Sequence, residues 1–463
     1  MLFNSFYFFI FLLIVFLLYW SSKSLKYRTF ILFASSYFFY AQWDYRFLFL
    51  IFVSSLVDFL CGYMMSKKNK KLLLAFSLII NLGLLAIFKY YNFFVDSFKT
   101  LFLIPETFQG IEIILPIGIS FYTFQSLSYT IDVYKKNIQP CKDPLVFFTF
   151  VSFFPQLVAG PIERAKNLIK QFKTHKEFNY EQAMAGFNLI IWGLFKKIVI
   201  ADNLAHAVNN VFGKYNEMSS LSLLAALFLF AIQIYCDFSG YSDMARGIAK
   251  LFGIELMINF KTPYFARDLG EFWRRWHISL STWFRDYIFI PLGGSVLNKT
   301  RTALNILIVF LISGLWHGAN TKFIFWGFIH ALFFLPLIIS GHHSHYKDKN
   351  LFNNYKIKDF LKMLCTFFIV CFAWLPFRAD SIEQCLSIIK RIFNKSFFSL
   401  ECYGTEFLII ALSFLLFEWF SKNDQYPLEK SSNKLLKNLY YFVLISLMMN
   451  YGYQTQEFIY FQF

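Results

Sequence analysis

Charged residues are scarce in this chain of 463 residues. Asp, Glu, Lys and Arg together make up 16% of the sequence, whereas hydrophobic residues make up 57%. Soluble globular proteins contain about 25% charged residues, so a fold that is mainly surrounded by water is excluded. The sequence therefore predicts an all-α polytopic membrane protein in which residues 1–463 form a single domain.

Several signatures of soluble enzymes are also missing. The sequence contains no Gly-x-Ser-x-Gly elbow, phosphate-binding loop, dinucleotide fingerprint or His-Glu-x-x-His motif. The seven cysteines include no Cys-x-x-Cys pair, and several of them lie in apolar runs, so neither a metal site nor a disulfide framework is expected. Any chemistry must therefore come from polar groups at or near membrane depth.

Apolar runs recur along the whole chain. A helix that crosses a bilayer needs about 20 mainly apolar residues, and by this rule we expect roughly eleven to thirteen apolar helices, some of them re-entrant. The runs are 2–20, 29–43, 46–65, 72–95, 111–133, 144–160, 183–200, 219–237, 302–316, 322–339, 360–377, 404–420 and 435–453. Residues 250–301 form the longest stretch without a clear crossing, and their Trp and Arg content predicts a segment along the membrane interface.

Positive charge is concentrated between these runs. A net charge of +16 would suggest nucleic acid as a partner of a soluble protein, but here Lys and Arg cluster in short loops. This distribution is typical of cytoplasmic loops of membrane proteins. We therefore expect the lipid bilayer and no nucleic acid as a partner, with loops 66–71 and 422–437 in the cytoplasm. Both chain termini, including a tail at 454–463, are then expected to be extracytoplasmic.

Acidic and basic side chains also occur in or beside the apolar runs. We expect most of these side chains to form ion pairs or hydrogen bonds with a structural role. The residues concerned are Asp58, Lys89, Asp132, Asp237 and Asp243. Two of the eight histidines, His277 and His317, stand out in polar runs next to apolar ones. A charged imidazole is costly near the bilayer, and a pKa near neutrality suits general base catalysis. From the residues alone, His317 could equally be a polar group that packs between helices.

The runs around both histidines resemble a known family. Residues 273–287 read Trp-Arg-Arg-Trp-His-Ile-Ser-Leu-Ser-Thr-Trp-Phe-Arg-Asp-Tyr, and residues 315–320 read Leu-Trp-His-Gly-Ala-Asn. Both are similar to signatures of the membrane-bound O-acyltransferases. The bacterial branch that O-acetylates alginate and peptidoglycan is similar along nearly the whole chain. Further matching stretches are 115–122, 155–161, 237–243 and 290–294.

The resemblance implies a fold and roles for particular residues. The helices would surround a transmembrane tunnel in one membrane-bound O-acyltransferase domain. His317 would be the catalytic residue and His277 would support it, while Trp316 and Asn320 of the same motif would contact substrate. Three arginines are candidates for binding the phosphates of the donor, with anchoring to lipid headgroups as the alternative for each. They are Arg274, Arg275 and Arg285.

The same resemblance implies an activity. Acetyl would pass from a cytoplasmic thioester donor, acetyl coenzyme A, across the bacterial cytoplasmic (inner) membrane, and no bound cofactor is expected. The acceptor would be an extracytoplasmic polysaccharide, with peptidoglycan favoured over alginate. A separate extracytoplasmic esterase-like acetyltransferase would complete the transfer. The alternatives are a D-alanyl transferase for teichoic acid, a transporter without chemistry and a structural scaffold.

The last six residues form a second point of resemblance. Residues 458–463, Phe-Ile-Tyr-Phe-Gln-Phe, are similar to the Phe-x-Tyr-x-x-Phe acyl motif of the small partner protein in teichoic-acid D-alanylation. This similarity implies that Tyr460 is a catalytic residue that carries the acyl group on its phenolic oxygen. A simple interfacial anchor of aromatic residues is the alternative.

Overall fold

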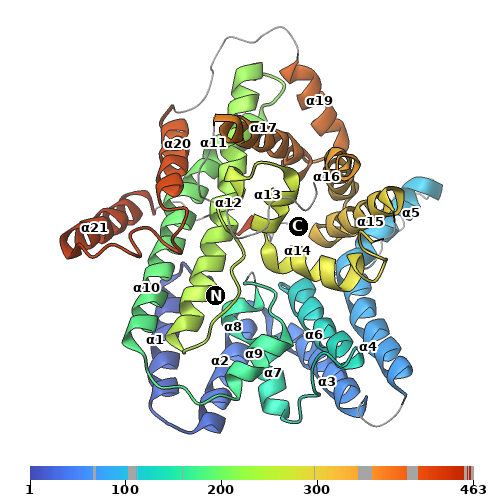
Figure 1. The fold of residues 1–463 in the computed structure, drawn as a ribbon, viewed down its shortest axis with the longest axis vertical. Coiled ribbons are helices and arrows are strands. Elements are labelled where there is room, and N and C mark those ends of the chain that lie inside the picture. The colour runs from blue at the N-terminus through green and yellow to red at the C-terminus, as the bar shows by residue number, and fades with distance from the viewer. Residues whose placement is uncertain are drawn as a thin grey trace. The chain divides into compact units, whose positions relative to one another are not determined.

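A computed structural model describes residues 1–65, 69–102, 111, 113–158, 160–296, 298–341, 357–393, 405–452, 456, 458 and 459. Within these residues all regular secondary structure is helical, which confirms the predicted fold class. The chain divides into two compact units, the first made of residues 1–190 and 244–257 and the second of residues 191–243 and 258–463. The long helix α12 (Ser220–Leu251) contributes to both (Figure 1).

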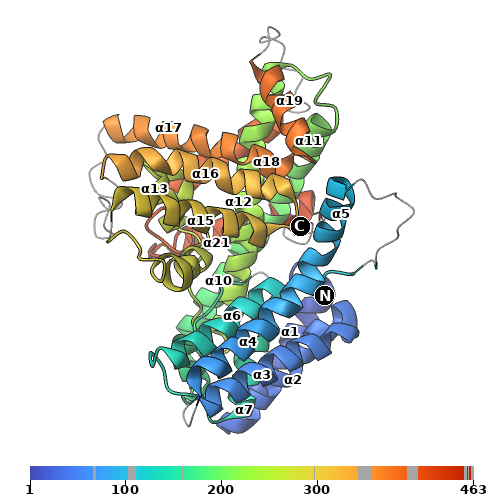
Figure 2. The ribbon, with the colours of Figure 1, turned by 90° about the vertical axis from the view of Figure 1, so that its right-hand side faces the viewer.

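The first unit is a bundle of apolar helices. They are α1 (Phe6–Trp20), α2 (Leu25–Asp44), α3 (Leu48–Met64), α4 (Lys70–Leu85), α5 (Tyr91–Phe102), α6 (Ile119–Tyr134), α7 (Pro144–Ser152), α8 (Phe154–Leu157), α9 (Ala165–Phe172) and the start of α10 (Tyr180–Phe195). Helices α3, α4 and α6 pack against one another (Figure 2). Asp58 of α3 accepts hydrogen bonds from Ser77 Oγ at 2.5 Å and from Asn81 Nδ2 at 2.9 Å, which confirms structural pairing for this carboxylate.

The predicted run 144–160 is not one continuous helix. Helix α7 ends at Ser152, Phe153 has a φ of −48° and a ψ of 108°, and α8 begins directly afterwards. The cause is Pro155, because proline has no N–H and its ring clashes with the carbonyl group four residues earlier in a continuing helix. Neither short helix is long enough to cross a bilayer.

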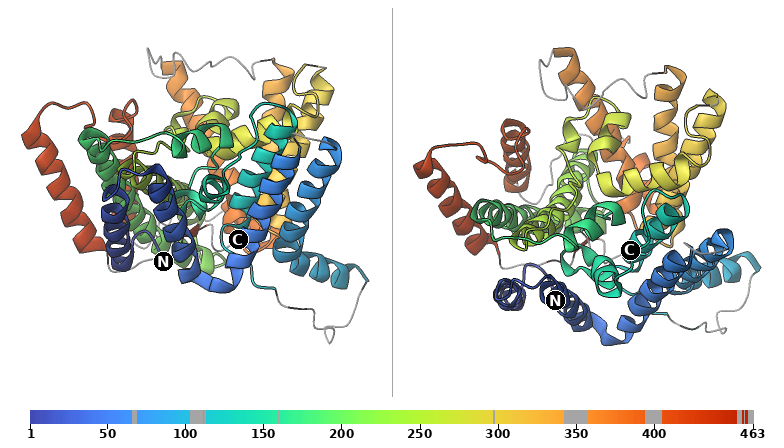
Figure 3. Two further views of the ribbon diagram at one scale, coloured as in Figure 1. Left: turned by 90° about the horizontal axis from the view of Figure 1, so that it is seen from below. Right: turned by 60° about the horizontal axis from the view of Figure 1, so that its bottom comes forward.

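The second unit contains the remaining helices. After the end of α10 they are η3 (Lys196–Ala201), α11 (Asp202–Gly213), most of α12, η4 (Pro263–Phe265), α13 (Leu269–Arg275), α14 (Ile278–Phe284), η5 (Arg285–Phe289), α15 (Lys299–His317), α16 (Thr321–Ile339), α17 (Ile357–Ala373), α18 (Leu375–Arg378), α19 (Ile382–Ile392), α20 (Thr405–Phe420) and α21 (Lys434–Tyr451). Helices α15 and α16 lie side by side, with α17 next to α16 (Figure 2). The red helices α20 and α21 lie at the edge of this unit (Figure 3).

Among the residues that the structure describes, seven helical segments are long and apolar enough to cross a membrane, and α1 is a shorter apolar helix. The seven are 25–64, 70–99, 180–213, 220–251, 299–317, 321–339 and 357–378. The chain is therefore a multi-pass membrane protein. Every helix that the structure describes between residues 252 and 296 is too short to cross, as the sequence predicts for this stretch.

Helix α12 is longer than predicted, because its polar second half continues beyond residue 237 as helix. Asp237 lies 2.7 Å from Lys197 Nζ, and Asp243 lies 2.6 Å from Lys196 Nζ. Both lysines belong to η3, which follows α10. Carboxylates that are paired with cations inside a protein need no contact with water. Helix α12 can therefore continue through Asp237 and Asp243.

Candidate functional site

His277 sits at a sharp turn of the backbone between α13 and α14. Its φ of 42° and ψ of 55° are left-handed, a conformation that costs a residue with a side chain roughly 1–2 kcal/mol. Asn259 holds this turn. Its carbonyl oxygen accepts a hydrogen bond from the Ile278 N–H at 2.9 Å, and its side-chain oxygen accepts one from the Ser279 N–H at 3.2 Å. A strained conformation persists only where the surrounding structure holds it, as Asn259 does here, and a functional role for His277 stays a prediction.

Aromatic rings enclose the imidazole of His277. The residue is 1% exposed, and its ring centroid lies 4.6 Å from that of Phe238 and 5.9 Å from that of Trp316. Burial lowers the pKa of His277 to about 3, so the ring is neutral at pH 7. A neutral imidazole has one nitrogen that donates a hydrogen bond and one that accepts, which suits the positioning of a hydroxyl group.

His317 is the last residue of α15. It is 4% exposed, and its ring centroid lies 5.0 Å from that of Trp326 and 5.2 Å from that of Phe377. The next residue, Gly318, leaves the helix with an extended backbone, and a Cβ atom at this position would collide with the ring of Phe323. The glycine therefore lets the end of α15 approach α16 closely, and this contact fixes the position of His317.

Trp316 connects the two histidines. Its ring centroid lies 5.9 Å from that of His277 and 5.0 Å from that of His317. The structure thus brings together three residues that the sequence motifs single out, although they come from the two separate runs 273–287 and 315–320. Their roles in catalysis and substrate binding stay predictions.

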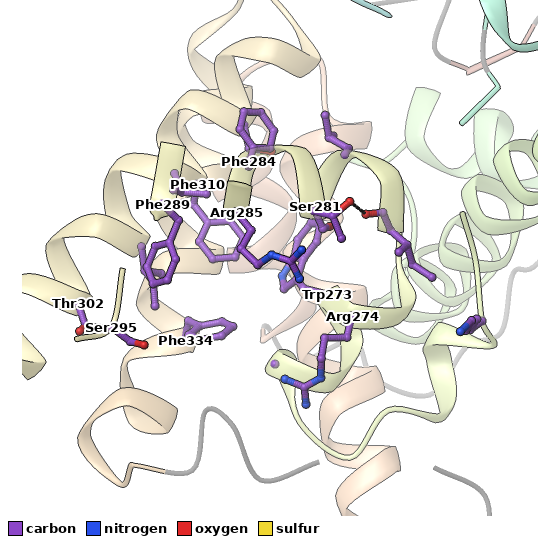
Figure 4. A pocket seen from close by; sticks show the side chains of 18 residues that line it. Trp273, Arg274, Ser281, Phe284, Arg285, Phe289, Ser295, Thr302, Phe310 and Phe334 are labelled. Atoms are coloured by element: carbon purple, nitrogen blue, oxygen red, sulfur yellow. Dashed lines mark hydrogen bonds between the residues drawn. The ribbon is translucent and has the colours of Figure 1, made fainter. Parts of the chain in front are cut away.

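The three candidate arginines lie in two different environments. Arg274 and Arg285 line a pocket of about 400 Å³ in the second unit, and Figure 4 shows both side chains at its walls. Arg275, by contrast, is buried and pairs with Glu271, which also pairs with Arg267 at 3.0 Å. The expected cationic patch therefore contains Arg274 and Arg285, of which Arg285 pairs with the partly exposed Asp286 at 2.8 Å. The guanidinium group of Arg275, by contrast, is buried against Glu271.

The pocket combines basic groups with apolar walls. Its lining consists of Lys261, Gly270, Trp273, Arg274, Ile278, Leu280, Ser281, Thr282, Phe284, Arg285, Phe289, Ser295, Thr302, Ile306, Val309, Phe310, Ser313 and Phe334. The ring of Trp273 lies 5.8 Å from that of Trp326, which in turn contacts His317. One tryptophan ring thus lies between this wall of the pocket and His317. Such a pocket suits a flexible ligand with a phosphate group at one end.

Two further predicted residues are placed differently. Asn320 is exposed, and its side-chain oxygen caps α16 by accepting a hydrogen bond from the Lys322 N–H at 3.0 Å. Substrate contact by Asn320 stays a prediction beside this structural role. Tyr460 lies outside the residues that the structure describes.

Sequence reasoning missed a contact between the end of the chain and α12. Asp237 Oδ2 accepts a hydrogen bond from the Ile459 N–H at 2.7 Å, and the Lys197 ammonium group donates one to the Gln456 carbonyl oxygen at 3.0 Å. The expected pairing of Asp237 is confirmed, but its second partner was not foreseen. No local pattern could have revealed it, since 222 positions separate the two residues.

Comparison with known proteins gives matches over most of the chain. The model of the membrane-bound O-acyltransferase family matches residues 35–375. A peptidoglycan O-acetyltransferase of Helicobacter pylori is 38% identical over 386 residues, which are 77% of this chain and 72% of the relative. A probable alginate O-acetylase of Pseudomonas aeruginosa is 35% identical over 454 residues, or 95% of this chain and 85% of the relative. A teichoic acid D-alanyltransferase of Streptococcus thermophilus is 28% identical over 265 residues, which are 53% of this chain and 62% of the relative.

Proposed function

The chain belongs to the membrane-bound O-acyltransferase family and is a membrane O-acyltransferase, and from this premise we propose that it transfers acetyl from acetyl coenzyme A toward an extracytoplasmic polysaccharide. The acetyltransferase relatives match more of the chain at higher identity than the D-alanyltransferase relative, which supports acetyl as the acyl group. Peptidoglycan is the favoured acceptor and alginate the second. The location is the bacterial inner membrane, with both termini outside.

The observation that carries this proposal is that two buried histidines, His277 and His317, both contact the ring of Trp316. A nitrogen of His317 takes the proton of the attacking hydroxyl group while its oxygen bonds to the thioester carbonyl carbon. The carbon–sulfur bond breaks, and the thiolate of the donor leaves and takes up the proton from His317, which returns the imidazole to its neutral form. His277 orients the hydroxyl group, and the surrounding rings exclude the water that would hydrolyse the donor.

The donor would enter through the pocket that contains Arg274 and Arg285. Guanidinium groups bind phosphate oxygens through paired hydrogen bonds, whereas the apolar walls suit the pantetheine arm. The ring contact from Trp273 through Trp326 to His317 supports this direction of approach. The donor does not stay bound as a cofactor, because it is consumed in each turnover.

The acceptor in the first transfer would be Tyr460. Its neighbour Ile459 is held by Asp237, and Phe458 packs on Phe238, whose ring contacts His277. These contacts support a relay in which the phenolic oxygen of Tyr460 receives acetyl. An extracytoplasmic esterase-like acetyltransferase then accepts the group and transfers it to the polysaccharide, since an aryl ester is activated for transfer.

Radiolabelled acetyl coenzyme A tests the proposal. Membranes that contain the wild-type chain should attach the label covalently to the protein and, with the partner present, to the polysaccharide. A D-alanyl transferase would incorporate no acetyl and would require a D-alanyl thioester. A transporter would move label without any covalent attachment, and either result would contradict the proposal.

A further inference from the structure

A buried ion cluster lies where the end of the chain meets α12. Lys197 Nζ is 2.8 Å from Asp202 Oδ1 and 2.7 Å from Asp237 Oδ1. An ammonium group has three N–H donors, and the third is directed to the Gln456 carbonyl oxygen at 3.0 Å. Without that carbonyl group, a buried cation would lose one of its three acceptors, so the cluster favours the bound tail.

The second oxygen of Asp237 completes the contact. It accepts the Ile459 N–H at 2.7 Å, so Lys197 and Asp237 together bind one carbonyl oxygen and one N–H of the same segment. Both hydrogen bonds involve the main chain of the tail and a charged partner. Hydrogen bonds of this kind are stronger than those between neutral groups, and they hold a peptide whatever its side chains are.

Side-chain packing adds selectivity for an aromatic residue. Phe458 is 1% exposed, and its ring centroid lies 4.7 Å from that of Tyr241 and 5.7 Å from that of Phe238. Asp237 and Tyr241 are four residues apart on α12 and therefore share one face of the helix. Phe238 also touches His277, with ring centroids 4.6 Å apart. A single ring thus separates the bound tail from the histidine.

We propose that Lys197 and Asp237, supported by Asp202, are positioning residues that clamp the main chain of the tail at Gln456 and Ile459. The clamp holds the segment against the aromatic wall of His277 and sets how far the following residues can reach. The functional role of this clamp rests on the proposed acyl relay. Binding of the tail by the clamp does not depend on that relay. Its ligand is this chain's own tail, recognised through two main-chain groups and one buried phenylalanine.

The first experiment measures binding of the tail without any reference to activity. Ile459→Cys keeps the N–H that Asp237 accepts and places a thiol at a position that is 5% exposed. Alkylation of this thiol in the full-length detergent-solubilised protein is followed by peptide mass mapping. We expect the rate to be at least about tenfold lower than in the unfolded protein, and to rise about tenfold when Phe458→Ala is added.

Gln456→Ala is the matched control for the first experiment. Gln456 contacts Lys197 through its carbonyl oxygen, so this variant should leave the alkylation rate unchanged. If the thiol reacts as fast in the native protein as in the unfolded protein, the clamp does not exist. A large acceleration by Gln456→Ala would show that the side chain rather than the main chain is recognised, and would also overturn the proposal.

The second experiment measures whether the clamp is needed for acetylation of the polymer. Ile459→Pro removes the N–H that Asp237 accepts and keeps an apolar residue, whereas Ile459→Val keeps both. Polymer acetylation should be at least about tenfold lower in the proline variant than in the valine variant. Equal acetylation by both variants would refute a positioning role. Failure of the relay looks different, because Tyr460→Phe would then be fully active while the thiol at position 459 stays protected.

Discussion

Replacement of His277 by glycine and by alanine separates the strain of its turn from the chemistry of its imidazole. Both variants lose the ring and leave similar cavities, but they differ in the cost of the left-handed backbone at a φ of 42°. That conformation costs a residue with a Cβ atom roughly 1–2 kcal/mol. Glycine avoids the cost but loses roughly 0.5–1 kcal/mol more conformational entropy on folding. The glycine variant should therefore be more stable than the alanine variant by about 0.8 kcal/mol, the difference between the midpoints of these two ranges.

The assay compares thermal unfolding of the two purified variants in the same detergent. A difference of this size corresponds to a midpoint that is higher by roughly 1 °C for the glycine variant, because the unfolding entropy of a 463-residue chain is large. Acetyl transfer should be reduced to the same low level in both, because neither has an imidazole at this position. If the alanine variant is as stable as the glycine variant, the turn is not strained. If either variant keeps wild-type activity, His277 does not support catalysis.

Three further changes test other parts of the account. Arg275→Ala should destabilise the protein by about 1.5–3 kcal/mol, because the buried Glu271 carboxylate loses one of its two cationic partners and keeps Arg267, and a normal unfolding temperature would contradict this. Tyr460→Phe should abolish polymer acetylation while expression stays normal, whereas an interfacial anchor would tolerate the change. Cysteines introduced at 66–71 and 422–437 should react only after permeabilisation of intact cells, and labelling without it would reverse the predicted orientation.

The elements that the sequence predicts best are those in which local pattern decides the structure. The run 302–316 corresponds to α15, which begins at Lys299 and ends at His317. Asn298 caps its first turn by accepting a hydrogen bond from the Arg301 N–H at 2.7 Å, and Gly318 follows its last residue. The apolar run alone located this helix to within three residues at its start and one at its end, because the residues that cap it lie directly beside the run.

Features that depend on distant contacts were not predictable in this way. The turn at His277 is held by Asn259, and no periodicity indicates that these two segments meet. The continuation of α12 beyond Asp237 depends on Lys197, which belongs to another helix. Likewise, the three arginines look equivalent in sequence, but the fold places only Arg275 beside Glu271 in the interior. Motifs therefore identified which residues to consider, whereas tertiary contacts decided how each of them is used.

Acetyl transfer by His317→Ala tests most directly whether His317 is the general base. Membranes with equal amounts of wild-type and variant protein are supplied with radiolabelled acetyl coenzyme A, and label in the polysaccharide is counted. His175→Ala, which removes an exposed histidine of the first unit, is the matched control and should behave like the wild type. Loss of a general base should lower the transfer by His317→Ala about 10²- to 10⁴-fold. Transfer at the wild-type rate by a folded, inserted variant would contradict the assignment of His317 as the base.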